Sequence, residues 1–153
     1  MTRPLIALLA MLSAFPASAQ APSVMGTWLT ASKAAQVQLA PCADPARGPV
    51  CGRIVKLIDP RDAGGKPMVP EDVTDAHNAD PSLRGRKVLG MMLLYDFIKA
   101  GDPNSFESGT IYNGENGKTY RANITLQADG TLRLRGYVGT PMFGETQIWT
   151  RVQ

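Results

Sequence analysis

The stretch TYRANITLQADGTLRLRGY, residues 119–137, decides the fold class. Apolar or small residues at positions 120, 122, 124 and 126 alternate with polar ones, and the alternation resumes after Ala128-Asp129-Gly130. A period of two is typical of a strand with one buried and one wet face, and a short connection containing Asp-Gly joins antiparallel strands. The stretch therefore predicts a β-hairpin.

The same kind of pattern recurs along the chain, with segments rich in β-branched, aromatic or alternating residues. These candidate strands are residues 26–31, 35–39, 52–58, 88–98, 108–112, 119–127, 131–138 and 146–152. Most connections between them are short, which favours an up-and-down meander. Because an open meander leaves two exposed edges, we predict an all-β, eight-stranded antiparallel barrel that is closed or nearly closed.

Small residues within or beside these strands leave two interpretations open. Gly90, Ala122, Gly136 and Gly139 stand where a packed core would favour Val or Leu. They indicate either an internal cavity or the bulges and bends at which glycine is common.

One connection, residues 59–87, is too long for a hairpin loop and carries six acidic residues and several prolines. Within it, Asp80-Pro81-Ser82-Leu83 predicts a short helix, because Asp is a favoured N-cap and Pro suits the first turn. A long loop in a small domain is typically a lid or binding loop, or a disordered excursion; a solvated acidic loop is the simplest interpretation.

The first nineteen residues have the features of a cleavable signal peptide. Arg3 supplies the positive start, residues 5–15 form an apolar run, and Ala17-Ser18-Ala19 offers small residues for cleavage after Ala19. The run is too short to span a bilayer, although an N-terminal anchor is the alternative, and Gln20 stands where a lipoprotein would have Cys. We therefore expect one exported domain, residues 20–153, that is periplasmic or secreted and not stably inserted in a membrane.

The charge balance argues against nucleic acid as a partner. The 153-residue chain has 16 Lys and Arg against 13 Asp and Glu, and removal of residues 1–19 takes away only Arg3. Binding to a nucleic-acid backbone needs several cations gathered on one face. The clusters at residues 84–87 and 133–135 are explained by a solvated loop and by the outward face of a strand.

The two cysteines, Cys42 and Cys51, fit an exported protein. In such a protein a pair of cysteines is more often a disulfide than a metal site or redox couple, and with a single His the chain has too few ligands for zinc. The alternative is two buried free thiols. We predict a disulfide that closes a short loop, and no metal site or cofactor.

Several blocks spread over the chain together resemble one bacterial family. They are Met25-Gly26-Thr27-Trp28, Val50-Cys51-Gly52-Arg53-Ile54, residues 75–78 with 83–86, Gly90, residues 108–113, 116–120 and 132–137, and Gln147-Ile148-Trp149-Thr150-Arg151. The family is the one called domain of unknown function 2147. The resemblance implies an exported protein with a lipocalin-like (calycin-like) barrel and no established chemistry.

The Gly-x-Trp of Gly26 and Trp28 is also similar to the first-strand signature of lipocalin-type barrels, in which the Trp closes one end beneath a late Arg. Arg151 is the candidate for that Arg, and Trp149 is an alternative packing partner. A guanidinium over an indole contributes about 0.5 to 2 kcal/mol. We expect Trp28 and Arg151 to be structural and the mouth to lie at the opposite end.

Few residues suggest catalysis. His77 is the only imidazole, and no nucleophile elbow or phosphate-binding glycine loop is present. We therefore predict that the protein is not an enzyme. The alternative enzyme would use loop carboxylates such as Asp75, with His77.

The leading hypothesis is a binding protein that encloses a small hydrophobic or amphipathic molecule without covalent chemistry. Arg84 and Arg86 are placed near the mouth for an anionic head group. The predicted lining residues are Met92, Leu94, Tyr112, Tyr120, Ile124 and Leu134. The second hypothesis is a cell-envelope interaction or structural module whose barrel is solid and holds no ligand.

Overall fold

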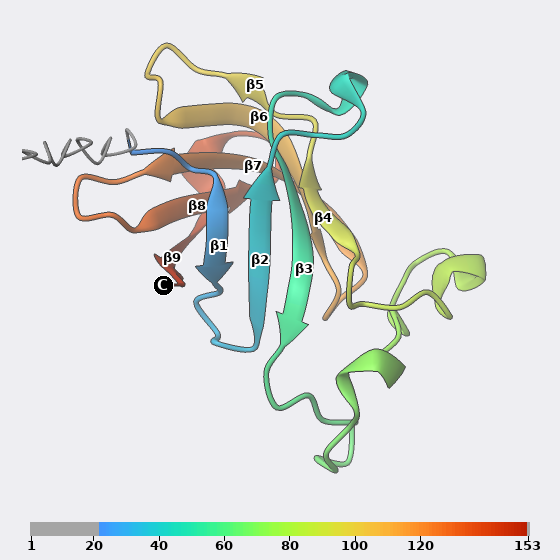
Figure 1. Ribbon diagram of the computed structural model, residues 1–153. Helices are drawn as coiled ribbons and strands as arrows, with labels where there is room; N and C mark the ends of the chain where they lie inside the picture. The colour runs from blue at the N-terminus through green and yellow to red at the C-terminus, as the bar shows by residue number, and fades with distance from the viewer. Residues whose placement is uncertain (1–21, 153) are drawn as a thin grey trace, which may run out of the picture.

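The computed structural model describes residues 22–152, which form nine strands and four single turns of 3-10 helix (Figure 1). The signal peptide expected at residues 1–19 lies outside the described residues. The strands are β1 (Gly26–Leu29), β2 (Ala35–Ala40), β3 (Cys51–Leu57), β4 (Met92–Tyr95), β5 (Ile98–Lys99), β6 (Ser105–Asn113), β7 (Lys118–Leu126), β8 (Leu132–Tyr137) and β9 (Glu145–Arg151).

Eight of these strands close into an antiparallel barrel. Hydrogen bonding runs in the order β4-β3-β2-β1-β9-β8-β7-β6, and the pairing of β4 with β6 joins the two ends. The short β5 adds to the edge of β6. Closure pairs the edges that an open sheet would expose to other chains. The predicted eight-stranded up-and-down barrel is therefore confirmed.

The strand boundaries differ from the prediction mainly around β4. Residues 88–91, expected to be strand, form a turn in which Gly90 has a positive φ of 83°, a conformation that glycine adopts without strain. Gly139 also lies in a bend with positive φ. These two glycines thus mark bends and do not line a cavity.

The long connection between β3 and β4 leaves the end of the barrel at which β3 finishes and is drawn in green in Figure 1. The short helix expected after Asp80 is a single 3-10 turn, η3 (Pro81–Leu83), because the chain reverses at once to pair with residue 75. Asp80 caps it as predicted, since its carboxylate accepts a hydrogen bond from the backbone N–H of Ser82.

The disulfide between Cys42 and Cys51 is confirmed and lies at the other end of the barrel, where it closes the connection between β2 and β3. No helix between residues 22 and 152 is long and apolar enough to cross a membrane.

Candidate functional site

The interior of the barrel differs between its two ends. At the end near the disulfide, which we call the closed end, the inward-facing side chains are nearly inaccessible to solvent. Neighbouring side chains occupy the space beside two of the interior glycines. A Cβ on Gly52 would lie 2.8 Å from a side-chain atom of Leu39, and a Cβ on Gly109 would overlap the Phe97 ring. The buried side chains of the core include Trp28, Val37, Leu39, Leu94, Phe97, Ile124, Leu132, Leu134 and Trp149.

Arg151 covers the indole of Trp28 at this closed end. Its guanidinium carbon lies 4.2 Å from the ring centroid, and its two terminal nitrogens donate to the carbonyls of Met25 at 2.8 Å and Ser23 at 2.5 Å. The Trp28 indole N–H donates to the carbonyl of Val24 at 2.8 Å. The contact therefore joins the last strand to the segment that precedes the first.

At the other end of the barrel, which we call the open end, the inward-facing side chains are more accessible to solvent. Strand pairing places Ile111, Tyr120, Gly136 and Gln147 on the inward face, and all four remain part-exposed. A Cβ added to Gly136 would meet only one atom within 4 Å, Cγ2 of Ile111 at 4.0 Å. The Tyr120 hydroxyl accepts a hydrogen bond from Asn116 at 2.9 Å. The open end thus combines apolar surface with a few polar groups.

The predicted lining residues fall into three groups. Leu94, Ile124 and Leu134 face inward and belong to the packed closed half, whereas Tyr120 faces inward at the open end. Tyr112 and Met92 face outward, contrary to expectation. Tyr112 pairs with Thr119, which lies on the outer side of β7, and Met92 pairs with Arg53 beside an outer hollow.

A β-bulge explains each of the two misplaced side chains. The register shifts between Phe106 and Gly109 on β6, so that Tyr112 points away from the interior that Phe106 faces. A second register shift lies between Gly52 and Arg53 on β3, opposite β4. Because of it, Met92 faces outward, whereas Leu94, two residues further along β4, faces inward. An extra residue in a strand reverses the facing of the side chains beyond it, and local alternation in the sequence does not reveal it.

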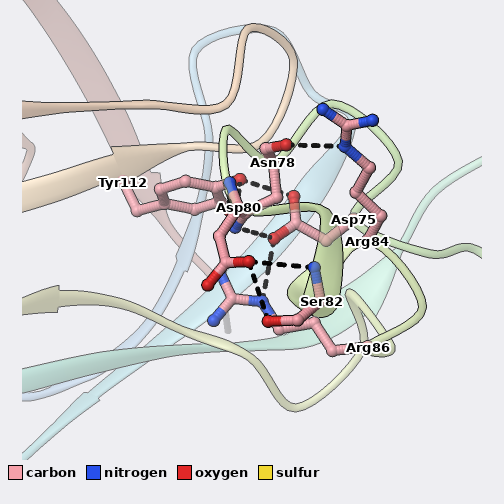
Figure 2. A network of polar contacts seen from close by, with 7 residues as sticks. All are labelled: Asp75, Asn78, Asp80, Ser82, Arg84, Arg86 and Tyr112. Carbon is pink, nitrogen blue, oxygen red and sulfur yellow. Dashed lines mark hydrogen bonds and ion pairs between the residues drawn. The ribbon is translucent and has the colours of Figure 1, made fainter.

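Tyr112 takes part in a buried polar network that fastens the long loop to the outside of β6 (Figure 2). Asp75, only 1% exposed, is the centre of the network. Its carboxylate accepts hydrogen bonds from the Tyr112 hydroxyl at 2.5 Å, from the Asn78 amide at 2.7 Å and from Nε of Arg86 at 2.8 Å. We call Asp75, Asn78, Arg86 and Tyr112 the loop latch.

The latch is reinforced by the backbone around it. The N–H of Asp75 donates to the carbonyl of Arg86, and a bridge pairs Thr74 with Lys87, so the two arms of the loop are joined. At the tip, Gly117 in the β6–β7 turn lies so close to the carbonyl of His77 that a Cβ there would overlap it. The loop is therefore packed against the side of the barrel at its open end.

Electrostatics in the latch favour a neutral Tyr112. Burial raises the pKa of Tyr112 above its ordinary value of 10.0, and the hydrogen bond to Asp75 and the negative charge of that carboxylate raise it further. The Arg86 guanidinium, 5.1 Å from the Tyr112 ring centroid, opposes this change.

Arg84 and Arg86, expected together at the mouth, are not brought together. Figure 2 shows their guanidinium groups on opposite sides of Asp75. Arg86 is committed to Asp75, whereas Nε of Arg84 donates to the carbonyl of Asn78 at 2.8 Å and the side chain is exposed.

The two loop residues considered for catalysis, Asp75 and His77, lie in different surroundings. All three donors around Asp75 are protein groups, and His77 is exposed. Within residues 22–152, no group of three or more His, Cys, Asp or Glu side chains is placed to hold a metal ion.

Two surface hollows lie away from the open end. One, of about 190 Å³, is lined by Gln38, Arg47, Arg53 and Met92 on the outside of β2–β4. The other, about 830 Å³ and broadly open, lies at the closed end beside Arg151 and the β7–β8 turn.

The closed antiparallel barrel, with a Trp on its first strand beneath an Arg on its last, defines a lipocalin-like fold. A solved structure described as "Protein HP1028 from the human pathogen Helicobacter pylori belongs to the lipocalin family" superposes with a TM-score of 0.66 at 23% identity, covering 85% of this chain and 83% of that one. The sequence matches the family described as uncharacterized protein conserved in bacteria (DUF2147) over residues 26–151, and the chain belongs to this family. No curated protein matches it significantly.

Proposed function

We propose that this chain is an exported binding protein that holds a small hydrophobic or amphipathic molecule at the open end of its barrel. The observation that carries the proposal is the space beside Gly136, which is bordered by the part-exposed side chains of Ile111 and Tyr120. A concave, mainly apolar surface with a few polar groups is the usual form of a small-molecule site. The lipocalin-like fold supports the same class of ligand.

In this proposal the predicted lining residues have different roles. Ile124 and Leu134 pack beneath the site and are not exposed to it, because they are buried one step deeper in the barrel than Ala122 and Gly136. Tyr120 forms part of the wall. Arg84 remains the candidate for an anionic head group, since Arg86 already pairs with Asp75.

The proposed export of the protein has two supports. The disulfide between Cys42 and Cys51 fits the oxidising environment outside the cytoplasm. The sequence of residues 1–19 has the pattern of a signal peptide with cleavage after Ala19. A periplasmic or secreted location follows from the proposal.

The proposed binding is non-covalent. Both the fold and the family point to a binding protein and not to an enzyme. The buried carboxylate that could act as a base, Asp75, is instead bound by three protein donors in the latch.

The first test is native mass spectrometry of the mature protein purified from an exporting host, followed by denaturing extraction of any small molecule. We expect an extra mass of lipid-like size that extraction releases. A bare polypeptide mass that persists after incubation with a lipid extract would overturn the proposal.

A matched pair of variants tests the position of the site. Gly136→Leu adds bulk to the open end with no neighbouring atom closer than 4.0 Å to its Cβ, and we expect it to weaken binding of a fluorescent long-chain fatty acid by about tenfold or more. Gly101→Leu adds the same atoms to an exposed loop with nothing within 4 Å and should leave binding unchanged. Equal affinity in both folded variants would place the ligand elsewhere.

The second candidate function is an envelope interaction or structural module with no ligand. The packed closed half, in which Phe97 occupies the space at Gly109, favours it. This candidate predicts a bare mass and the same thermal midpoint with and without lipid extract.

A further inference from the structure

The connection between β8 and β9 carries an exposed apolar tip at the open end of the barrel. The tip consists of Val138, Met142 and Phe143, which are 71%, 79% and 80% exposed. Gly136 pairs with Glu145 at the base of this connection, which places the tip at the open end of the barrel. Large apolar side chains gathered on one exposed loop are a common sign of an interaction site.

The tip is held in a fixed shape by Arg135. Its Nε donates to the carbonyl of Pro141 at 2.9 Å, one terminal nitrogen donates to the carbonyl of Met142 at 3.2 Å, and the other donates to the Thr146 hydroxyl at 2.9 Å. These bonds satisfy two backbone carbonyls of the tip internally. Satisfied carbonyls lower the free-energy cost of moving this turn into an apolar environment.

A basic surface adjoins the tip. Strand pairing places Arg121, Arg133 and Arg135 on the outer face of β7–β9, and within the described residues this face carries no Asp or Glu. None of the ion pairs found between residues 22 and 152 includes these three arginines. We call them the basic face.

We propose that the apolar tip and the basic face together dock this protein on an anionic lipid bilayer. The two features match the two contributions to peripheral membrane binding, which are apolar side chains in the interfacial region and cations near anionic head groups. Because the basic face is positively charged, it favours an anionic bilayer over a neutral one. A turn with three apolar side chains is also too small to supply the roughly 800 Å² per partner of a stable protein interface. Docking would bring the open end of the barrel to the bilayer.

The test is co-sedimentation of the mature protein with phosphatidylcholine vesicles that do or do not contain phosphatidylglycerol. We expect binding to the phosphatidylglycerol vesicles that weakens as salt is raised, because salt screens the arginines. Phe143→Ser should weaken this binding by about tenfold. Arg121→Gln should weaken it by about fivefold, since one cation near such a surface contributes about that factor.

The control variants lie on β5, away from the open end. Ile98→Ser removes an exposed apolar side chain and Lys99→Gln removes an exposed cation, and both should leave vesicle binding unchanged. Gly136→Leu should also bind vesicles normally, so that failure of the barrel ligand site and failure of docking are scored separately. Absence of vesicle binding by the unaltered protein, or equal losses in the tip and β5 variants, would overturn the proposal; capture of a protein partner without vesicle binding would do the same.

Discussion

The two ends of the barrel are built from the same eight strands but are stabilised differently. The closed end buries aromatic and aliphatic side chains around Trp28 and Phe97, is covered by Arg151 and is fastened by a disulfide. The open end leaves Ile111, Gly136 and Tyr120 part-exposed, and its long loop is held by the polar latch around Asp75. Apolar burial in one half can thus stabilise the fold while inward-facing side chains of the other half remain part-exposed.

The largest expected effect comes from emptying the closed end. Trp28→Ala should lower the free energy of unfolding by about 3 to 5 kcal/mol, because it removes a fully buried indole and leaves a cavity. Tyr120→Ala, inward at the open end, should cost only about 1 to 2 kcal/mol, because its side chain is already part-exposed. Denaturant unfolding measures both, and equal losses would contradict the difference between the ends.

The second prediction concerns the latch. Asp75→Ala should lower the free energy of unfolding by about 2 to 3 kcal/mol, since it leaves the Tyr112 hydroxyl and the Asn78 amide without their buried acceptor. Hydrogen exchange should become faster in residues 73–90 and stay slow around Trp28. Asp72→Ala, which removes an exposed partner of Lys87, is the control. It should change the free energy of unfolding by no more than about 1 kcal/mol and leave hydrogen exchange in residues 73–90 unchanged.

A pair of glycine substitutions compares the two halves with a single methyl group. Gly109→Ala should cost about 1 to 3 kcal/mol, because the new Cβ would overlap the Phe97 ring. Gly136→Ala should be neutral or stabilising by up to about 1 kcal/mol, because the site has room and the unfolded chain loses freedom. Thermal unfolding distinguishes them, and a destabilised Gly136→Ala would show that the open end is packed.

The smallest expected effect is the pH dependence of the latch. Because the folded protein raises the pKa of Tyr112 above 10.0, the neutral phenol stabilises the fold fully below that pH, and this contribution is lost as pH rises through the folded pKa. Tyr112→Phe should therefore flatten the decline in unfolding free energy above pH of about 10. Tyr95→Phe, on the outer side of β4, is the matched control. If the unfolding free energy declines identically in both variants, Tyr112 is not the cause of the decline.

Much of the barrel could be predicted from alternation and turn signals. The hairpin of β7 and β8, the eight strands and the disulfide each follow from a short stretch of sequence and were confirmed. The long loop was located correctly, but its attachment was not predicted. Asp75 and Tyr112 are 37 residues apart, and nothing local in the sequence pairs them.

The composition of the site was predicted less well than the fold. A bulge turns Tyr112 and another turns Met92 to the outside, so two of six expected lining residues fall on the wrong face. The apolar tip was not predicted either, although Met142-Phe143 beside Pro141 in a connection between strands was a visible signal.

By itself the sequence determined the features that depend on neighbouring residues: the strands, their antiparallel order, the cap at Asp80 and the cysteine pair. Such features follow from periodicity and turn chemistry, which act over a few positions. Only the tertiary structure decided which side chains face the interior, which end is filled and what buries Asp75. Those outcomes depend on strand register and on contacts between distant segments, and a shift of one residue changes them without altering the local pattern.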